Sequence, residues 1–127
     1  MDKTTLVSVD AERGAEIVKA LDERGLKVKV ALWAWLDEYE DWRLILAPPQ
    51  LDKLDLRQAY GKVNDVLAAA GFTVYNSPTK MIFRMSDFFI RQLRRRFSKV
   101  ARVEGMRLGG QLIGDRWIED AYVYRIS

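Results

Sequence analysis

Two largely apolar runs separated by an acidic segment predict a β-hairpin in the first half of the chain. A first strand over 28–36 is followed by the acidic turn 37–41 and a second strand over 42–47. Because successive side chains on a strand point to opposite faces, Trp33 and Trp35 share one face. The aliphatic residues that alternate with them share the other: Val28, Val30, Leu32, Ala34 and Leu36. Both faces of the first strand are apolar, so each face needs a cover.

Apolar residues at helical spacing predict three helices. The first lies between Asp10, a candidate N-cap, and Gly25. The second follows the candidate cap Asp55 and ends at Gly71, and the third follows Ser86. Each helix carries one apolar stripe, which suits packing against a sheet.

The C-terminal part predicts a second hairpin. Its strands cover 103–113 and 117–126, and its turn is Gly114-Asp115. Between the second and third helices, 72–75 is a candidate short strand, while 81–85 fits either a strand or an extended lead-in. The pattern therefore predicts an α+β fold: an antiparallel sheet of two hairpins with about three helices, in a two-layer single domain spanning 1–127. Strand order is left open.

The amino-acid composition excludes several classes of protein and of catalysis. Of the 127 residues, 49% are hydrophobic and 31% are charged, as in a globular domain. No apolar run approaches the roughly 20 residues of a membrane span, and Met1–Thr5 has no signal-like apolar core, which favours a cytoplasmic protein without membrane attachment. The chain contains no Cys and no His, which excludes thiol and imidazole catalysis and structural zinc sites. Carboxylate chemistry with Mg²⁺ stays open.

Positive charge is concentrated on the third predicted helix. Residues 86–107 hold seven Lys or Arg and two Asp or Glu, a balance of +5 in a chain of net charge +3. At about 100° per residue, one side of the helix is apolar and the other is basic. The apolar side comprises Phe89, Ile90, Leu93, Phe97 and Val100. The basic side comprises Arg91, Arg94, Arg95, Lys99 and Arg102, with Arg96 at the border.

This basic side has two interpretations. It is a candidate contact for the phosphates of a nucleic acid or another polyanion. It is also what the solvated outer face of an amphipathic helix looks like, and cations near a helix C-terminus interact favourably with the helix dipole.

Trp33 and Trp35 raise a separate question, because the predicted helices have apolar surface for only one sheet face. Core filling, a stacking platform for bases and self-association are the alternatives. Either a later segment of the chain, such as the C-terminal strands, covers them, or a second copy does. We predict a contact between two copies, in a homodimer that Trp35→Glu would convert to a folded monomer.

Two groups of carboxylates complete the candidates. The acidic residues of 37–41 lack the spacing of an EF-hand loop and fit a solvated turn. Glu119 and Asp120 lie in an otherwise apolar strand, where they fit either a buried acid-base pair or the charges of an edge strand. We predict no catalytic residue, no metal site and no cofactor.

Ala31-Leu32-Trp33 followed by Trp42-Arg43-Leu44, together with the ending 120–126, resembles a pattern in small uncharacterised bacterial proteins. The resemblance covers about a fifth of the chain, implies a single bacterial cytoplasmic domain and brings no activity with it.

These observations predict a non-enzymatic accessory or binding domain whose basic helix binds nucleic acid or another polyanion. The alternative is a protein-interaction or homo-oligomerisation module that uses the aromatic sheet face. A metal-dependent enzyme with carboxylate chemistry ranks last.

Overall fold

The computed structural model describes Leu6, residues 8–73 and residues 76–127. Within this part of the chain, the helices and strands follow one another in the predicted order. The elements are α1 (Ser8–Glu23), β1 (Val30–Leu36), β2 (Asp41–Ala47), the short 3₁₀ helix η1 (Pro49–Leu51), α2 (Leu56–Ala69), β3 (Lys80–Ile82), α3 (Phe88–Phe97), β4 (Arg107–Ile113) and β5 (Arg116–Ile126).

The described strands form one sheet in the order β3-β2-β1-β5-β4. Both predicted hairpins are present, and β1 is also antiparallel to β5. The predicted antiparallel sheet is confirmed only in part, because β3 runs parallel to β2. A parallel neighbour needs a crossover connection, which α2 supplies. The candidate strand 72–75 is not formed at Phe72 and Thr73, and 74–75 lie outside the described residues.

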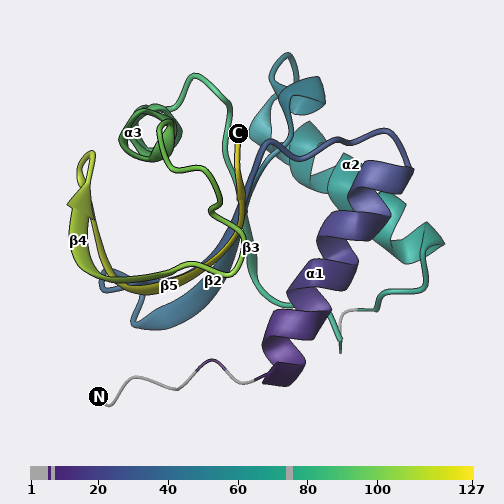
Figure 1. Ribbon diagram of the computed structural model, residues 1–127. Helices are drawn as coiled ribbons and strands as arrows, with labels where there is room; N and C mark the ends of the chain where they lie inside the picture. The colour runs from purple at the N-terminus through teal and green to yellow at the C-terminus, as the bar shows by residue number, and fades with distance from the viewer. Residues whose placement is uncertain (1–5, 7, 74–75) are drawn as a thin grey trace.

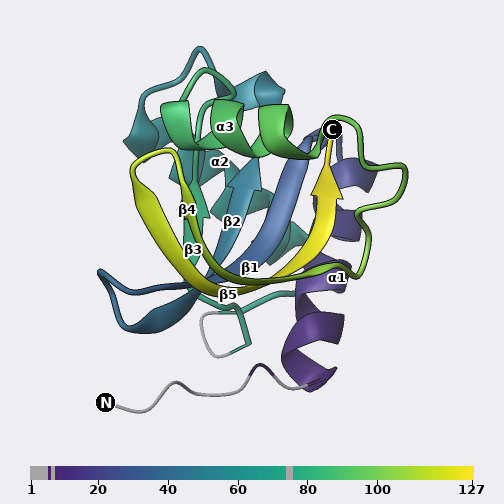
Figure 2. The same cartoon turned by 60° about the vertical axis from the view of Figure 1, so that its left-hand side comes forward.

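Helices cover both faces of the sheet, so the predicted two-layer arrangement is wrong. Figure 1 shows α1 and α2 on one face and α3 on the other, where β4 and β5 curl around it. Figure 2 shows α3 lying across the strands. The physical reason is the apolar character of β1 on both sides: all of its residues are buried, and one helical layer could cover only half of them.

The sheet separates two hydrophobic cores. The core under α1 and α2 contains Trp33, Trp35 and Trp42 from the strands. The core under α3 contains the alternate residues of β1, such as Leu32 and Leu36. This division is the one that strand alternation predicts for the first hairpin.

Strand β5 departs from regular alternation at two places. Its pairing with β1 shifts between Ala31 and Leu32 and again between Trp35 and Leu36. The β5 residues in the α3 core are consequently spaced by three at both shifts: Ile118, Ala121, Val123 and Ile126. Such bulges increase the local twist and bend of a strand, in keeping with the curl that Figure 1 shows.

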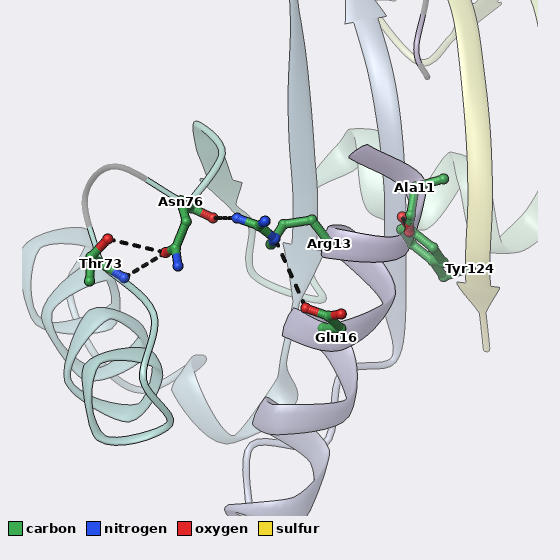
Figure 3. A network of polar contacts seen from close by, with 6 residues as sticks. All are labelled: Ala11, Arg13, Glu16, Thr73, Asn76 and Tyr124. Carbon is green, nitrogen blue, oxygen red and sulfur yellow. Dashed lines mark hydrogen bonds and ion pairs between the residues drawn. The ribbon is translucent and has the colours of Figure 1, made fainter. Parts of the chain in front are cut away.

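The approach of α1 to the sheet depends on Gly14. A Cβ atom at this position would lie 2.7 Å from Trp33 Nε1 and still closer to Tyr124 Oη. Tyr124 donates a hydrogen bond to the carbonyl oxygen of Ala11 in α1 and accepts one from Trp33 Nε1 at 3.0 Å. Figure 3 labels Ala11 and Tyr124 where α1 meets the sheet. Glycine at position 14 therefore leaves room for the Tyr124 hydroxyl and its two hydrogen bonds between α1 and the sheet.

Candidate nucleic-acid interface

Helix α3 begins one residue later than predicted. Asp87, not Ser86, is its N-cap, and the Asp87 carboxylate accepts a hydrogen bond from the backbone N–H of Phe89 at 2.9 Å. Both residue types suit this position, and a carboxylate also interacts favourably with the positive end of the helix. The predicted cap at Ser86 is therefore wrong by one residue.

The apolar side of α3 is confirmed except at its end. Phe89, Ile90, Leu93 and Phe97 are buried against the sheet. Val100 was assigned to the same side, but it lies beyond the helix and is 42% exposed. The Ser98 hydroxyl donates to the carbonyl oxygen of Arg95 at 3.2 Å, which satisfies one of the carbonyls that a helix leaves free where it ends.

The predicted cations are all exposed, and they lie partly on a helix and partly in the loop that follows it. Arg91, Arg94 and Arg95 lie on α3, whereas Lys99 and Arg102 lie in the connection between α3 and β4. Arg96, the border residue, is exposed as well. We call this group the cationic surface: Arg91, Arg94, Arg95, Arg96, Lys99 and Arg102.

None of the cationic surface forms an ion pair with an Asp or Glu side chain within the described part of the chain. Arg94 Nε donates to an oxygen of Ser127, the last residue of the sequence, at 2.9 Å, and Arg96 Nη1 donates to Gln111 Oε1 at 3.2 Å. The Gln111 amide is neutral, so it orients the Arg96 guanidinium group without compensating its charge. Elsewhere, cations of α1, β2, β4 and β5 do form ion pairs with carboxylates.

Trp33 and Trp35, predicted as a contact between two copies, are placed in the core instead. Their side chains are 4% and 5% exposed, under α1 and α2 of the same chain. Trp35 also packs edge-on against Trp42 with ring centroids 6.1 Å apart. Splitting the helices between the two faces provides the cover that the sequence did not reveal. A homodimer stays a prediction, but these two rings are not presented to a partner.

The acidic turn between β1 and β2 contributes to an acidic hollow at the edge of the molecule. A hollow of about 340 Å³ is lined by Asp37 and Glu38 together with Asp115, Arg116 and Trp117. Arg116 forms an ion pair with Glu38. Among the described residues, no group of three or more potential ligands is arranged to hold a metal ion.

Glu119 and Asp120 belong to neither of the expected settings. Strand β5 lies between β1 and β4, so it is not an edge strand. The Asp120 carboxylate pairs with Arg107 across the hairpin at 2.8 Å. Glu119 is exposed and accepts a hydrogen bond from Trp117 Nε1 at 3.0 Å. Both carboxylates therefore serve cross-strand or local contacts on the hairpin.

A second hollow, of about 520 Å³, lies between α2 and the approach to β3. Lys80 lines it with Asp65 and several hydroxyl groups. Partial burial lowers the pKa of Lys80 from its ordinary value. The Lys80 ammonium group donates to the backbone oxygen of Pro78 at 3.5 Å. No hydrogen bond or ion pair joins the Lys80 ammonium group to a second titratable side chain in the described residues, since Tyr60 donates only to the backbone oxygen of Lys80. The hollow therefore contains no recognisable catalytic pair.

A network of polar contacts ties α1 to the segment before β3. Figure 3 shows the Arg13 side chain between Asn76 and Glu16. Arg13 donates to the backbone oxygen of Asn76 at 2.6 Å, and the Asn76 amide oxygen accepts from the backbone N–H of Thr73. These groups bind one another, so the network is structural.

Comparisons of the chain with protein-family models, with curated proteins and with solved structures find no match. The resemblance noted from Ala31-Leu32-Trp33 and 120–126 is untouched by this result and stays a prediction. No helix within the described residues has the length and apolar character to cross a bilayer.

Proposed function

We propose that the protein is a non-enzymatic binding domain that holds a nucleic acid, or a polyanion of similar charge density, on the cationic surface. The observation that supports this proposal is a concentration of exposed cations that form no ion pair with an Asp or Glu side chain in the described residues. Other exposed cations, such as Lys27 and Lys62, also have no such ion pair, but six of them fall together within residues 91–102, a segment without any acid. This concentrated group is available to phosphates.

The chemistry of the side chains suits phosphate oxygens. A guanidinium group presents several donors in a planar fork and stays charged at all ordinary pH values. Phosphate contacts release condensed counterions, so the affinity depends steeply on salt and little on base sequence. The hydrogen bond from Arg94 to Ser127 and that from Arg96 to Gln111 hold two of the forks in place, which reduces the side-chain entropy lost on binding.

The proposal is tested by titrating the protein with a fluorescent oligonucleotide between about 0.05 and 0.2 M salt. The wild type should bind, and log K should fall linearly with log salt. Arg91→Ala and Arg95→Ala should each weaken binding and reduce the salt slope by about one. Their unfolding free energies should change by less than about 0.5 kcal/mol, because both side chains are exposed and unpaired in the described structure.

Lys19→Ala is the matched control. It removes the same charge from an exposed position on α1, where Lys19 lies 4.0 Å from Glu23. If binding follows net charge alone, Lys19→Ala should weaken it as much as Arg91→Ala does. A surface-specific interaction leaves Lys19→Ala close to the wild type. Absence of binding by the wild type at low salt contradicts the proposal.

The other predicted functions have less support. An interaction module built on the aromatic sheet face would need Trp33 and Trp35 to be accessible, and both are buried. Metal-dependent chemistry would need a cluster of ligands, and the described residues contain no such cluster.

A further inference from the structure

Phe88 is an exposed aromatic ring at the start of the cationic helix. It is the first residue of α3, and its side chain is 50% exposed, whereas its neighbours Phe89 and Ile90 are buried. Residues three and four apart share one side of a helix, so Phe88, Arg91 and Arg95 form a row. The row spans about 10 Å along the axis at 1.5 Å per residue.

The ring is held in place by the turn between β4 and β5. A Cβ atom at Gly114 would lie 3.2 Å from both Cδ2 and Cε2 of Phe88, and 3.6 Å from Cγ of Gln92. Gly114 has a φ of +62°, which the tight turn requires and which glycine adopts without strain. One side of the ring therefore lies against backbone, while about half of the side chain stays open to solvent.

The other exposed rings in the described chain have acidic surroundings. Trp117 is 45% exposed, but it lines the hollow with Asp37, Glu38 and Asp115. Tyr39 is 42% exposed within the acidic turn, where its face is occupied by Arg43 at 4.5 Å. Carboxylates repel a phosphate chain, so neither of these rings suits a nucleic acid. Phe88 follows Asp87, but the Asp87 carboxylate accepts the backbone N–H of Phe89 at the N-cap. Along the helix, Phe88 lies in one row with Arg91 and Arg95, which form no ion pair among the described residues.

We propose that Phe88 stacks on an unpaired base of a single-stranded nucleic acid whose phosphates lie along Arg91 and Arg95. This inference rests on the proposed function and adds its substrate class. Every base has a π-face, so stacking on an aromatic ring adds affinity without sequence preference. A duplex keeps its bases inside the stack and cannot offer one to the ring. The row matches about three stacked nucleotides at 3.4 Å each.

The test compares three fluorescent ligands: an oligothymidylate of about 12 nucleotides, an abasic strand of the same length and a duplex. Binding is measured by anisotropy at one fixed low salt concentration. The wild type should bind the oligothymidylate about 5- to 150-fold more tightly than the abasic strand, the range expected for one stacked base. Phe88→Leu should bring the two affinities together, because it keeps an apolar contact with Gly114 but removes the aromatic face.

Two further variants make the result specific. Trp117→Leu removes an exposed ring of similar accessibility from the acidic hollow, and it should leave all three affinities within about twofold of the wild type. Phe88→Trp should retain the preference for bases and add a tryptophan emission that the oligothymidylate quenches and the abasic strand does not. Circular dichroism confirms that each variant is folded.

The outcomes separate the two proposals. If the wild type binds the normal and abasic strands equally and Phe88→Leu changes nothing, the stacking inference is overturned while polyanion binding stands. If none of the three ligands binds, the proposed function itself fails. A loss of base preference confined to Phe88→Leu supports both.

Discussion

The two faces of the sheet are covered by helices of different electrostatic character. Helix α1 carries five acidic and two basic residues, and the ion pairs of Arg13 and Lys19 lie within it. Helix α3 carries four arginines and no acid, and none of these arginines pairs with an Asp or Glu side chain among the described residues. Both helices bury an apolar stripe equally well, so burial does not distinguish them.

Polar contacts distinguish them further. The α1 side is joined to the sheet by the hydrogen bonds of Tyr124 to Trp33 and Ala11, and by the ion pair of Arg125 with Asp22 at 2.9 Å. On the α3 side the packed side chains are apolar, and the charged groups remain outside. The cations of α3 lie outside this apolar packing, where a ligand could reach them. The proposed binding function therefore belongs to the α3 side, whereas the polar contacts of the α1 side join α1 to the sheet.

The largest expected effect is that of placing a charge inside the α1 side. Trp35→Glu should destabilise the fold by at least about 5 kcal/mol, because it removes a buried ring and buries a carboxylate in an apolar core. Loss of this size approaches the whole stability of a domain of this length, so we expect an unfolded chain by circular dichroism. Trp117→Glu, at an exposed ring, should stay folded. A folded Trp35→Glu monomer would restore the earlier prediction of a contact between copies.

The next effect tests whether α3 is anchored by apolar packing. Leu93 is fully buried on α3 and Leu21 is fully buried on α1. Leu93→Ala and Leu21→Ala should each cost about 2–5 kcal/mol in urea denaturation, because both remove methylene groups from a packed core. A loss below about 0.5 kcal/mol for Leu93→Ala would mean that α3 is only loosely held on the sheet.

The smallest effect probes the polar contact under α1 and has a pH signature. Tyr124→Phe removes the acceptor of Trp33 Nε1, whose side chain is 4% exposed, and should cost about 1–3 kcal/mol near neutral pH. Burial raises the pKa of Tyr124 above its ordinary value of 10.0. Above that pH the unfolded chain loses the phenolic proton while the folded chain keeps it, so the contribution of Tyr124 to stability falls as the pH rises.

The measurement is the unfolding free energy at pH about 9 and about 11. Between these values the wild type should lose more stability than Tyr124→Phe, so the difference between the two proteins should shrink. The other tyrosines and Lys80 are present in both proteins, and their titration cancels in the comparison. An unchanged difference would show that the Tyr124 hydroxyl ionises as readily in the fold as in the unfolded chain.

The helices and strands could be predicted because capping residues and apolar patterns act over a few neighbouring residues. The Asp55 cap forms a full capping box with Gln58, and Gly71 follows α2 with a φ of +96°, as expected of helix termini. The apolar character of β1 on both sides indicated a strand that is covered on both sides. What could not be predicted was which segments supply the covers, because amphipathic helices fit either face.

The sequence predicted which residues make up the cationic surface, but it did not predict how the backbone arranges them in space. The residues of the cationic surface were identified by period alone, but the helix was expected to continue through Arg102 and ends at Phe97. Phe88 was missed as a site residue, since the contact that holds its ring is made by the turn at Gly114, which is distant in the sequence. Periodicity reports which side of an element is apolar and says nothing of contacts made by a loop from elsewhere in the chain.

The sequence by itself determined the helices, the two hairpins and the concentration of positive charge, because each depends on neighbours within a few residues. Tertiary structure decided the strand order, the parallel position of β3, the two register shifts of β5 and the burial of Trp33 and Trp35. Those outcomes depend on how distant segments share two apolar faces. Many pairings of the same elements bury similar area, and only the packing of the complete chain selects one of them.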